Sequence, residues 1–397
     1  MSPDLDRLAA LAVRFGANVQ PGQVVSISCE PGKEEVVRAI AAEAYRAGAK
    51  FVDVSWFDPH LKRARVLHSD EESLGYVPPW IGQRMLDLGE LRAARIGLTG
   101  PSAPGLLSDL DPVRIGKDPL PFVPEAVKVV NDQTTNWTAI PCPTLPWAQL
   151  VFPDLPADEA FAALWEQLWH VLRLDEEDPV AFWKERFGTL TSVAERLTAL
   201  QLDRLHFRGP GTDLTVGLLP SSKWIAAQMT TVGGIDHAPN LPSEEIFTAP
   251  DPERTSGTAT MTRPLVLGGS SITGLKVRFE NGRAVEVISE EHGAVLEEYL
   301  KRDEGAARLG EVALVDGQGR IGPLGTVFYD TLLDENAASH VAFGSAYAMT
   351  AGPGDQEKIN VSQIHIDVML GSPEIDVTGV RADGTEVEIL TAGVWQI

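Results

Sequence analysis

An alternating segment near the end of the chain carries the residues that suggest chemistry most directly. Between Gln363 and Leu370, apolar residues occupy every second position, which is typical of a strand with one buried face. On such a strand, His365 and Asp367 share the face opposite the apolar one. An imidazole and a carboxylate two residues apart can bind one metal ion. The segment also fits a core histidine that is hydrogen-bonded to its neighbour.

Three more residues could complete a metal site. His340 lies where the polar turn 334–339 meets an apolar stretch, Glu311 opens a strand after Gly310, and Glu245 interrupts an extended, largely apolar segment. Two histidines with several carboxylates would suit a dinuclear site for divalent ions. Each glutamate also fits an ordinary polar residue of a strand. If the segment around Glu245 is a strand, the side chains of Glu244 and Glu245 point to opposite faces, so only one of the two can face a given site.

Several common enzyme motifs are absent from the sequence. There is no GxxxxGK[ST] loop, no GxSxG elbow and no HExxH pair, which leaves P-loop NTPases and common serine hydrolases unsupported. The segment Gly268-Gly269-Ser270-Ser271 lacks the strand-to-helix context of a phosphate cradle, so we predict a turn rather than a ligand loop. The only cysteines, Cys29 and Cys142, exclude a disulfide scaffold and a cysteine-rich zinc site.

The amino-acid composition and the net charge limit the kinds of partner that the protein can bind. The 397 residues are 44% hydrophobic and 22% charged, as in an ordinary globular protein, and the formal charge is −23. Such an acidic balance argues against nucleic acid and against an anionic membrane surface as partners. No stretch approaches the ~18 consecutive apolar residues of a membrane span, and the first fifteen residues have no apolar signal core. We therefore expect a cytoplasmic protein.

The predicted secondary structure differs between the two halves of the chain. Up to about residue 190, predicted strands alternate with predicted helices, which indicates right-handed βαβ units and a mostly parallel sheet. The expected helices are 5–15, 34–47, 79–91 and 125–130, followed by the helical segment 158–187. The expected strands are 24–29, 51–56, 94–98 and 137–141.

Beyond about residue 200 the predicted strands come more often and the turn signals lie closer together. Hairpins are expected around Gly209-Pro210-Gly211, at Asn281-Gly282 and at Asp383-Gly384, the last two being type I′ signals. The predicted class is α/β: an N-terminal, mostly parallel αβα domain over residues 1–190, and a C-terminal α+β domain over residues 191–397 that carries the metal site.

Taken together, these segments resemble the thermophilic aminopeptidase family of metallopeptidases, which includes aminopeptidases T and S. The resemblance covers most of the chain and keeps the family's order of segments. One visible departure is conservative: Leu241 and Ser243 stand where methionine and threonine are expected. The segments that carry the resemblance to the family are 16–23 (GANVQPGQ), 131–147 (NDQTTNWTAIPCPTLPW), 211–218 (GTDLTVGL), 240–248 (NLPSEEIFT), 309–315 (LGEVALV), 331–344 (TLLDENAASHVAFG) and 360–372 (NVSQIHIDVMLGS).

The resemblance implies a ligand set and an activity. It implies that each chain uses two divalent ions (Zn²⁺, Co²⁺ or Mg²⁺) to remove N-terminal residues from short peptides, and that the chain is a homodimer. It places the active-site tyrosine on Tyr347. It places the metal ligands on Glu245, Glu311, His340, His365 and Asp367.

Two other classes of function stay open on the sequence. One is a dinuclear metallohydrolase of another ester or amide class, such as a phosphoesterase, which would use the same ligands. A phosphate substrate would also need arginine or lysine side chains near the site, and the ligand segments contain only Lys358. A non-catalytic protein that binds metal or a small ligand would keep the fold and lose activity. All five ligand positions and Tyr347 hold competent residues, which favours the enzyme.

Overall fold

The computed structural model describes residues 4–121, 123–226 and 228–397. The chain forms two compact units, the first from residues up to 186 together with 228–243, and the second from 187–226 together with 244–397. Helix α10 (Pro179–Leu200) carries the chain from one to the other. The domain boundary at residue 190 stays a prediction, and the return of 228–243 to the first unit was not anticipated.

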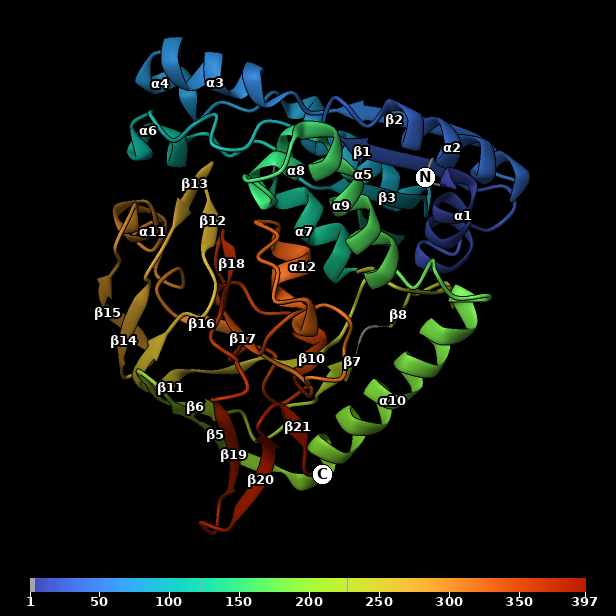
Figure 1. Ribbon diagram of the computed structural model, residues 1–397. Helices are drawn as coiled ribbons and strands as arrows, with labels where there is room; N and C mark the ends of the chain where they lie inside the picture. The colour runs from blue at the N-terminus through green and yellow to red at the C-terminus, as the bar shows by residue number, and fades with distance from the viewer. Residues whose placement is uncertain (1–3, 122, 227) are drawn as a thin grey trace. The chain divides into compact units, whose positions relative to one another are not determined.

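The first unit is built on a four-stranded parallel sheet with the order β2-β1-β3-β4; Figure 1 labels β1, β2 and β3 of this sheet. This order is the expected result of successive right-handed crossovers that start on β1 and reverse direction once. The apolar side chains of Val25, Ile27 and Ile96 are fully buried on one face of the sheet. The strands are β1 (Val24–Cys29), β2 (Phe51–Trp56), β3 (Ala94–Thr99) and β4 (Asn136–Pro141).

All the predicted helices of the first unit form, but two of them differ in detail and four further helices, α3, α4, α6 and α8, were not predicted. The first helix changes at Leu11 from an α-helix to a π-helix, Leu11–Gly16. The segment predicted as helical over 158–187 is two helices, because the chain turns between α9 and α10. The helices are α1 (Leu5–Ala10), α2 (Glu34–Arg46), α3 (Pro59–His68), α4 (Glu71–Leu74), α5 (Pro79–Glu90), α6 (Pro112–Lys117), α7 (Pro124–Asn131), α8 (Leu145–Val151) and α9 (Ala157–Val171), and the small ribbon β8 (Met229–Thr230) with β9 (Asp236–His237) completes the unit.

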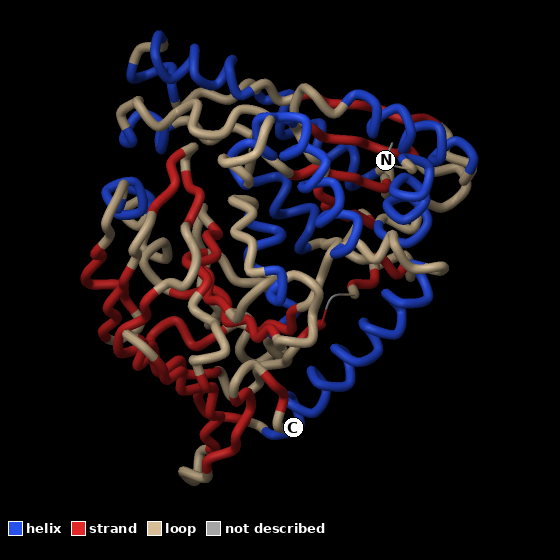
Figure 2. The backbone as a smooth tube through the Cα atoms, in the orientation of Figure 1, coloured by secondary structure: helices blue, strands red, loops and turns tan. Residues whose placement is uncertain are grey.

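The second unit is rich in strands, drawn red in Figure 2, and their pairings are antiparallel. Its larger sheet has the order β15-β14-β11-β6-β5-β19-β20-β21. All three predicted hairpins form in it, and Asn281 and Gly282 both have positive φ, as a type I′ turn requires. The strands are β5 (Leu202–Gly209), β6 (Thr212–Leu218), β11 (Pro250–Thr260), β14 (Lys276–Glu280), β15 (Arg283–Ile288), β19 (Asp376–Arg381), β20 (Glu386–Thr391) and β21 (Val394–Trp395).

A second, five-stranded sheet has the order β18-β17-β16-β10-β7, and its central strand β16 is buried along its whole length. The strands are β7 (Ile225–Ala226), β10 (Glu245–Thr248), β16 (Leu309–Val315), β17 (His340–Gly344) and β18 (His365–Met369). The remaining elements are the hairpin β12 (Leu265–Leu267) and β13 (Ser270–Ile272), which turns at the glycine pair, helices α11 (Gly293–Tyr299) and α12 (Thr331–Glu335), and the 3₁₀ turns Gly322–Leu324 and Ala348–Thr350.

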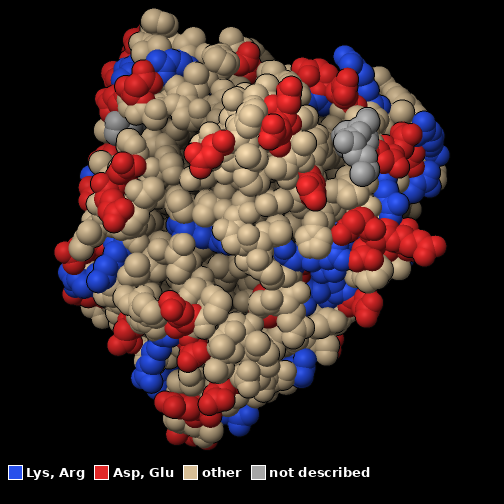
Figure 3. Space-filling view, viewed as in Figure 1, with Lys and Arg blue, Asp and Glu red and all other residues tan. Residues whose placement is uncertain are grey.

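A parallel sheet in the first unit and antiparallel sheets in the second confirm the predicted fold class. On the face drawn in Figure 3, acidic side chains are dispersed, with basic ones between them. Among the described residues, no helix is both long enough and apolar enough to cross a membrane.

Candidate metal centre

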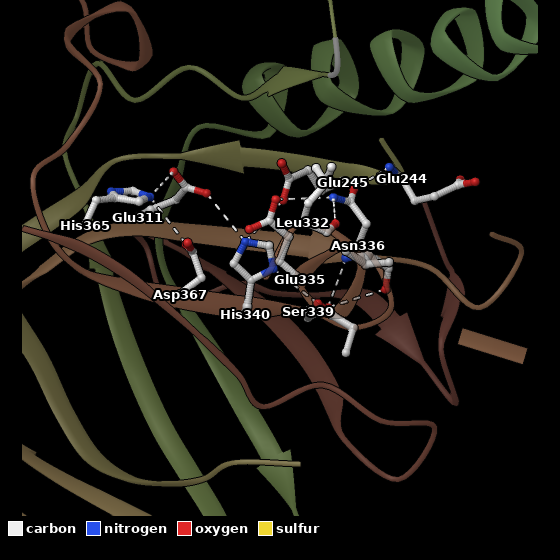
Figure 4. A network of polar contacts seen from close by, with 12 residues as sticks. Glu244, Glu245, Glu311, Leu332, Glu335, Asn336, Ser339, His340, His365 and Asp367 are labelled. Carbon is white, nitrogen blue, oxygen red and sulfur yellow. Dashed lines mark hydrogen bonds and ion pairs between the residues drawn. The ribbon is translucent and has the colours of Figure 1, made fainter. Parts of the chain in front are cut away.

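The five-stranded sheet brings together the five residues that the resemblance names as ligands. Glu245 begins β10, Glu311 lies in β16, and His340 begins β17. His365 and Asp367 both lie on β18, as the alternating pattern predicts. Four neighbouring strands therefore each supply at least one of these side chains (Figure 4).

The register of the strands puts the five side chains on one face. Glu311 and Asp367 lie on either side of Ala342 in one row, and His365 pairs with Gly344 in the next. Because Ala342 and Gly344 are small, no large side chain of β17 occupies the space between the ligand side chains at these two positions. A bulge at Gly310 sets this register, and a Cβ there would lie 2.2 Å from the Gly344 carbonyl oxygen, so only glycine fits.

The ligand atoms form two groups that share Glu311. One group is Glu245, Glu311 and His340, and the other is Glu311, His365 and Asp367; in each, the ligand atoms lie within 4.8 Å of one another. All of them except His365 are buried, and His365 keeps 28% of its side chain accessible. A carboxylate that belongs to both groups could serve as a ligand to two ions if both were bound.

The backbone fixes how both imidazoles point. Nδ1 of His340 lies 3.2 Å from the Ala338 carbonyl oxygen, and Nδ1 of His365 lies 2.8 Å from that of Ser345. A carbonyl accepts, so each Nδ1 carries the proton and donates. Each Nε2 then faces the carboxylates, at 3.1 Å from Glu245 for His340 and at 3.3 Å from Asp367 for His365. Imidazoles held in this way are typical of metal ligands.

A buried oxygen without a hydrogen bond shows that the cluster fits a cation. Oε2 of Glu245 is buried and accepts no hydrogen bond from any residue in the described part of the chain, although Nε2 of His340 is near. A buried carboxylate oxygen without a donor is costly unless a positive ion meets it. The mixed imidazole and carboxylate donors suit a borderline or hard divalent ion.

The electrostatics of the cluster are strongly coupled. Desolvation disfavours a charged His365, but the carboxylates of Asp367 and Glu311 outweigh it and raise the pKa of this imidazole to about 10. Burial raises the pKa of Glu311, while His340 opposes that rise. The cluster without metal therefore holds protons on its imidazoles, and a divalent ion must displace them.

Tyr347 lies at the edge of this cluster, seven residues after His340. Its ring centre is 5.5 Å from that of His365 and 5.9 Å from that of Phe247. Burial, and then the charge of Glu311, raise the pKa of its phenol. The hydroxyl therefore stays protonated through the neutral range and can act as a hydrogen-bond donor.

Two members of the cluster were missed by the sequence analysis. Glu335 ends α12, is buried, and has a raised pKa because of burial and then the charges of Asp367 and Glu245. Asn336 follows it and is fully buried. The only signal was their closeness in sequence to His340, in a stretch that we interpreted as a polar turn. Figure 4 shows the Glu244 carboxylate turned away from the cluster.

Asn336 ties two carboxylate-bearing segments together. Its Oδ1 accepts from the Glu244 backbone N–H at 2.6 Å, beside Glu245. Its Nδ2 donates to the Leu332 carbonyl oxygen at 2.9 Å and reaches Oε1 of Glu335 at 3.4 Å. The amide therefore positions both ends of the cluster at once.

Replacing Asn336 by aspartate is expected to weaken metal binding about 10–100-fold, as loss of a supporting contact around metal ligands typically does. The carboxylate still accepts from Glu244 but cannot donate to Leu332 and repels Glu335. Competition against a chelator would give the metal dissociation constant. The matched control is Asn131→Asp on the exposed end of α7. Equal dissociation constants in both variants would contradict the positioning role.

Comparisons with known proteins agree with this geometry. A family model described as thermophilic metalloprotease (M29) matches residues 1–395. The chain belongs to this family. It is 41% identical to aminopeptidase T of Thermus thermophilus over 99% of this chain and 98% of that protein, and 36% identical to aminopeptidase 2 of Geobacillus stearothermophilus over 99% and 97%. The solved structure of wild-type AmpT from Thermus thermophilus superposes with a TM-score of 0.90 at 40% identity, covering 99% of each chain.

Membership of the thermophilic metalloprotease family confirms the resemblance stated from sequence and the predicted class of a metal-dependent aminopeptidase, a hydrolase. It also supports the use of divalent metal, for which the cluster is the candidate site. The identity of each ligand and the number of ions are proposals.

Proposed function

We propose that this chain removes N-terminal residues from short peptides with two divalent ions, Zn²⁺, Co²⁺ or Mg²⁺, held in the cluster. Glu245, Glu311 and His340 would hold one ion, and Glu311, His365 and Asp367 the other. The observation that carries the proposal is the pair of three-residue groups that share Glu311. Bound divalent ions lower the pKa of water and polarise a carbonyl group.

The chain's own residues supply the rest of the chemistry. Tyr347 is a protonated donor at the edge of the cluster, and we assign it to stabilise the negative charge that develops on the carbonyl oxygen of the substrate. Glu335 is a buried carboxylate that belongs to neither ligand group, and we assign it to accept the proton that the attacking water loses. Glu244 is unsuited to this role, because its carboxylate points away from the cluster.

The curated relatives support a preference for a free N-terminus, because those reported above are named aminopeptidases. Glu245, Glu311, Glu335 and Asp367 crowd four carboxylates around two histidines. Two bound divalent ions would balance these four carboxylates, so the charge of the loaded site does not by itself select a free or a blocked end. We further propose that the protein works as a homodimer in the cytoplasm.

The decisive test compares a short unblocked peptide with its N-acetylated twin. We expect protein stripped with a chelator to release no free amino acid. Adding back Co²⁺, Zn²⁺ or Mg²⁺ should restore release from the unblocked peptide only. Amino-acid analysis of the supernatant measures both, and direct metal analysis of the dialysed protein should give two ions per chain. Release from neither peptide, with two ions bound, would overturn the peptidase and keep the site.

A further inference from the structure

One face of the parallel sheet in the first unit is unexpectedly polar. The strands of an all-parallel sheet are ordinarily buried on both faces and rich in aliphatic residues. Here the register places Asp53, Ser26, Arg95 and Trp137 in one row across β2, β1, β3 and β4. The opposite face of the same strands carries the buried aliphatic residues of the core. A row of this composition is unsuited to packing against the apolar side of a helix.

The next row toward the carboxyl ends of the strands reaches solvent. It contains Ser55, Ser28 and Gly97. Ser28 is exposed although it lies on a central strand. A Cβ placed on Gly97 would meet only the Ser28 hydroxyl at 3.6 Å and the Thr138 carbonyl oxygen at 3.9 Å, both within the sheet. No other atom of the described residues lies within 4 Å of that Cβ position, which leaves room beside the Ser28 hydroxyl.

Arg95 brings an uncompensated positive charge to this face. In the described part of the chain its guanidinium makes no hydrogen bond or ion pair, and its Nη1 atom is buried. Desolvation alone lowers its pKa, to about 10, and no carboxylate opposes that shift. The carboxylate in the same row, Asp53, is paired with Arg84 of α5. A buried charge without a counter-charge is costly, and natural proteins pair such groups.

Ser28 lies at a position in the fold where ligands bind, whereas Arg95 is the second residue of β3 and would have to extend its long side chain toward that end. The sheet order β2-β1-β3-β4 reverses direction between β1 and β3, and Ser26 of β1 is directly paired with Arg95 of β3. In open α/β sheets, ligands bind near the carboxyl ends of the strands at this reversal. Ser28 is the second-last residue of its strand, so its hydroxyl lies toward that end.

We propose that Arg95, together with the hydroxyl groups of Ser26 and Ser28, binds a small oxyanion, a carboxylate or a phosphate. The planar guanidinium offers a fork of donors that matches two oxygens of either group, and the serines add single donors beside it. The site contains no residue of the candidate metal centre, so this proposal does not rest on the proposed peptide hydrolysis.

Thermal unfolding at constant ionic strength tests the site. Sodium chloride is replaced stepwise by sodium acetate in one series and by sodium phosphate in another, with metal-loaded, dialysed protein. We expect a saturable rise in Tm for the wild type in at least one series, and none for Arg95→Met. Arg38→Met, which removes an exposed arginine from α2 of the same unit, is the matched control and should respond like the wild type. Arg95→Lys keeps the charge without the fork and should need more anion.

A local measurement separates binding from a general salt effect. Hydrogen exchange of peptides that cover residues 24–29 and 94–99 should slow on addition of the anion in the wild type and not in Arg95→Met. A rise in the acetate series identifies a carboxylate site, and a rise in the phosphate series alone identifies a phosphate site. The proposal is overturned if neither anion exceeds chloride, or if Arg95→Met responds as the wild type does.

Discussion

Replacing Glu311 by glutamine is expected to lower kcat/KM for peptide hydrolysis more than ~100-fold, beyond what changes to supporting contacts around a metal cost. Glu311 belongs to both ligand groups, so its loss weakens both ion sites at once. An amide keeps the size of the side chain but carries no charge and offers one oxygen where the carboxylate offers two. The expected primary defect is therefore metal loss, with activity following it.

Metal content and activity must be measured on the same Glu311→Gln preparation. We expect fewer than two ions per chain after dialysis, and partial recovery of activity at high metal concentration. Glu297→Gln, an exposed position on α11, is the matched control and should behave as the wild type. A Glu311→Gln protein with full activity and two bound ions would contradict the assignment of this residue as the shared ligand.

Replacing Tyr347 by phenylalanine is expected to lower kcat about 10²–10³-fold, the usual cost of removing one donor to a developing oxyanion. The ring contacts with His365 and Phe247 are kept, because phenylalanine has the same ring. Metal content should stay at the wild-type value, because no ligand is removed. The combination of intact metal and slow turnover distinguishes this variant from Glu311→Gln.

Steady-state kinetics on a short unblocked peptide would separate kcat from KM for Tyr347→Phe. A donor that acts in the transition state lowers kcat with little change in KM. Tyr76→Phe, at a tyrosine that is 60% exposed, is the control for loss of a phenol group. Equal kcat values for Tyr347→Phe and the wild type would remove Tyr347 from the chemistry.

Local sequence patterns predict most of the fold. The parallel half follows from strands and helices that alternate, and the hairpin at Asn281-Gly282 from residues that accept positive φ. The break between α9 and α10 was missed although the sequence marks it: the acidic run 175–178 interrupts the apolar periodicity, and Pro179 begins α10. The return of 228–243 to the first unit is a long-range event that no local pattern encodes.

The candidate site is only partly visible in sequence. The alternation around His365 predicts which side chains share a face of β18, but not that β10, β16 and β17 lie beside it. That order depends on strand pairing across long connections. Glu335 and Asn336 were missed because a helix end, rather than a strand, carries them into the cluster. The resemblance to the family, and not spacing, brought Glu245 and Glu311 into the prediction.

The histidines and carboxylates of the cluster lie on four strands that are neighbours only in the folded sheet. An unfolded chain therefore offers no comparable site, and every ion bound is free energy that favours the native state. Free metal concentration thus acts on this protein as a stabilising variable as well as a requirement for turnover. A cell that starves the protein of metal would lose the protein to unfolding and proteolysis as well as losing its activity.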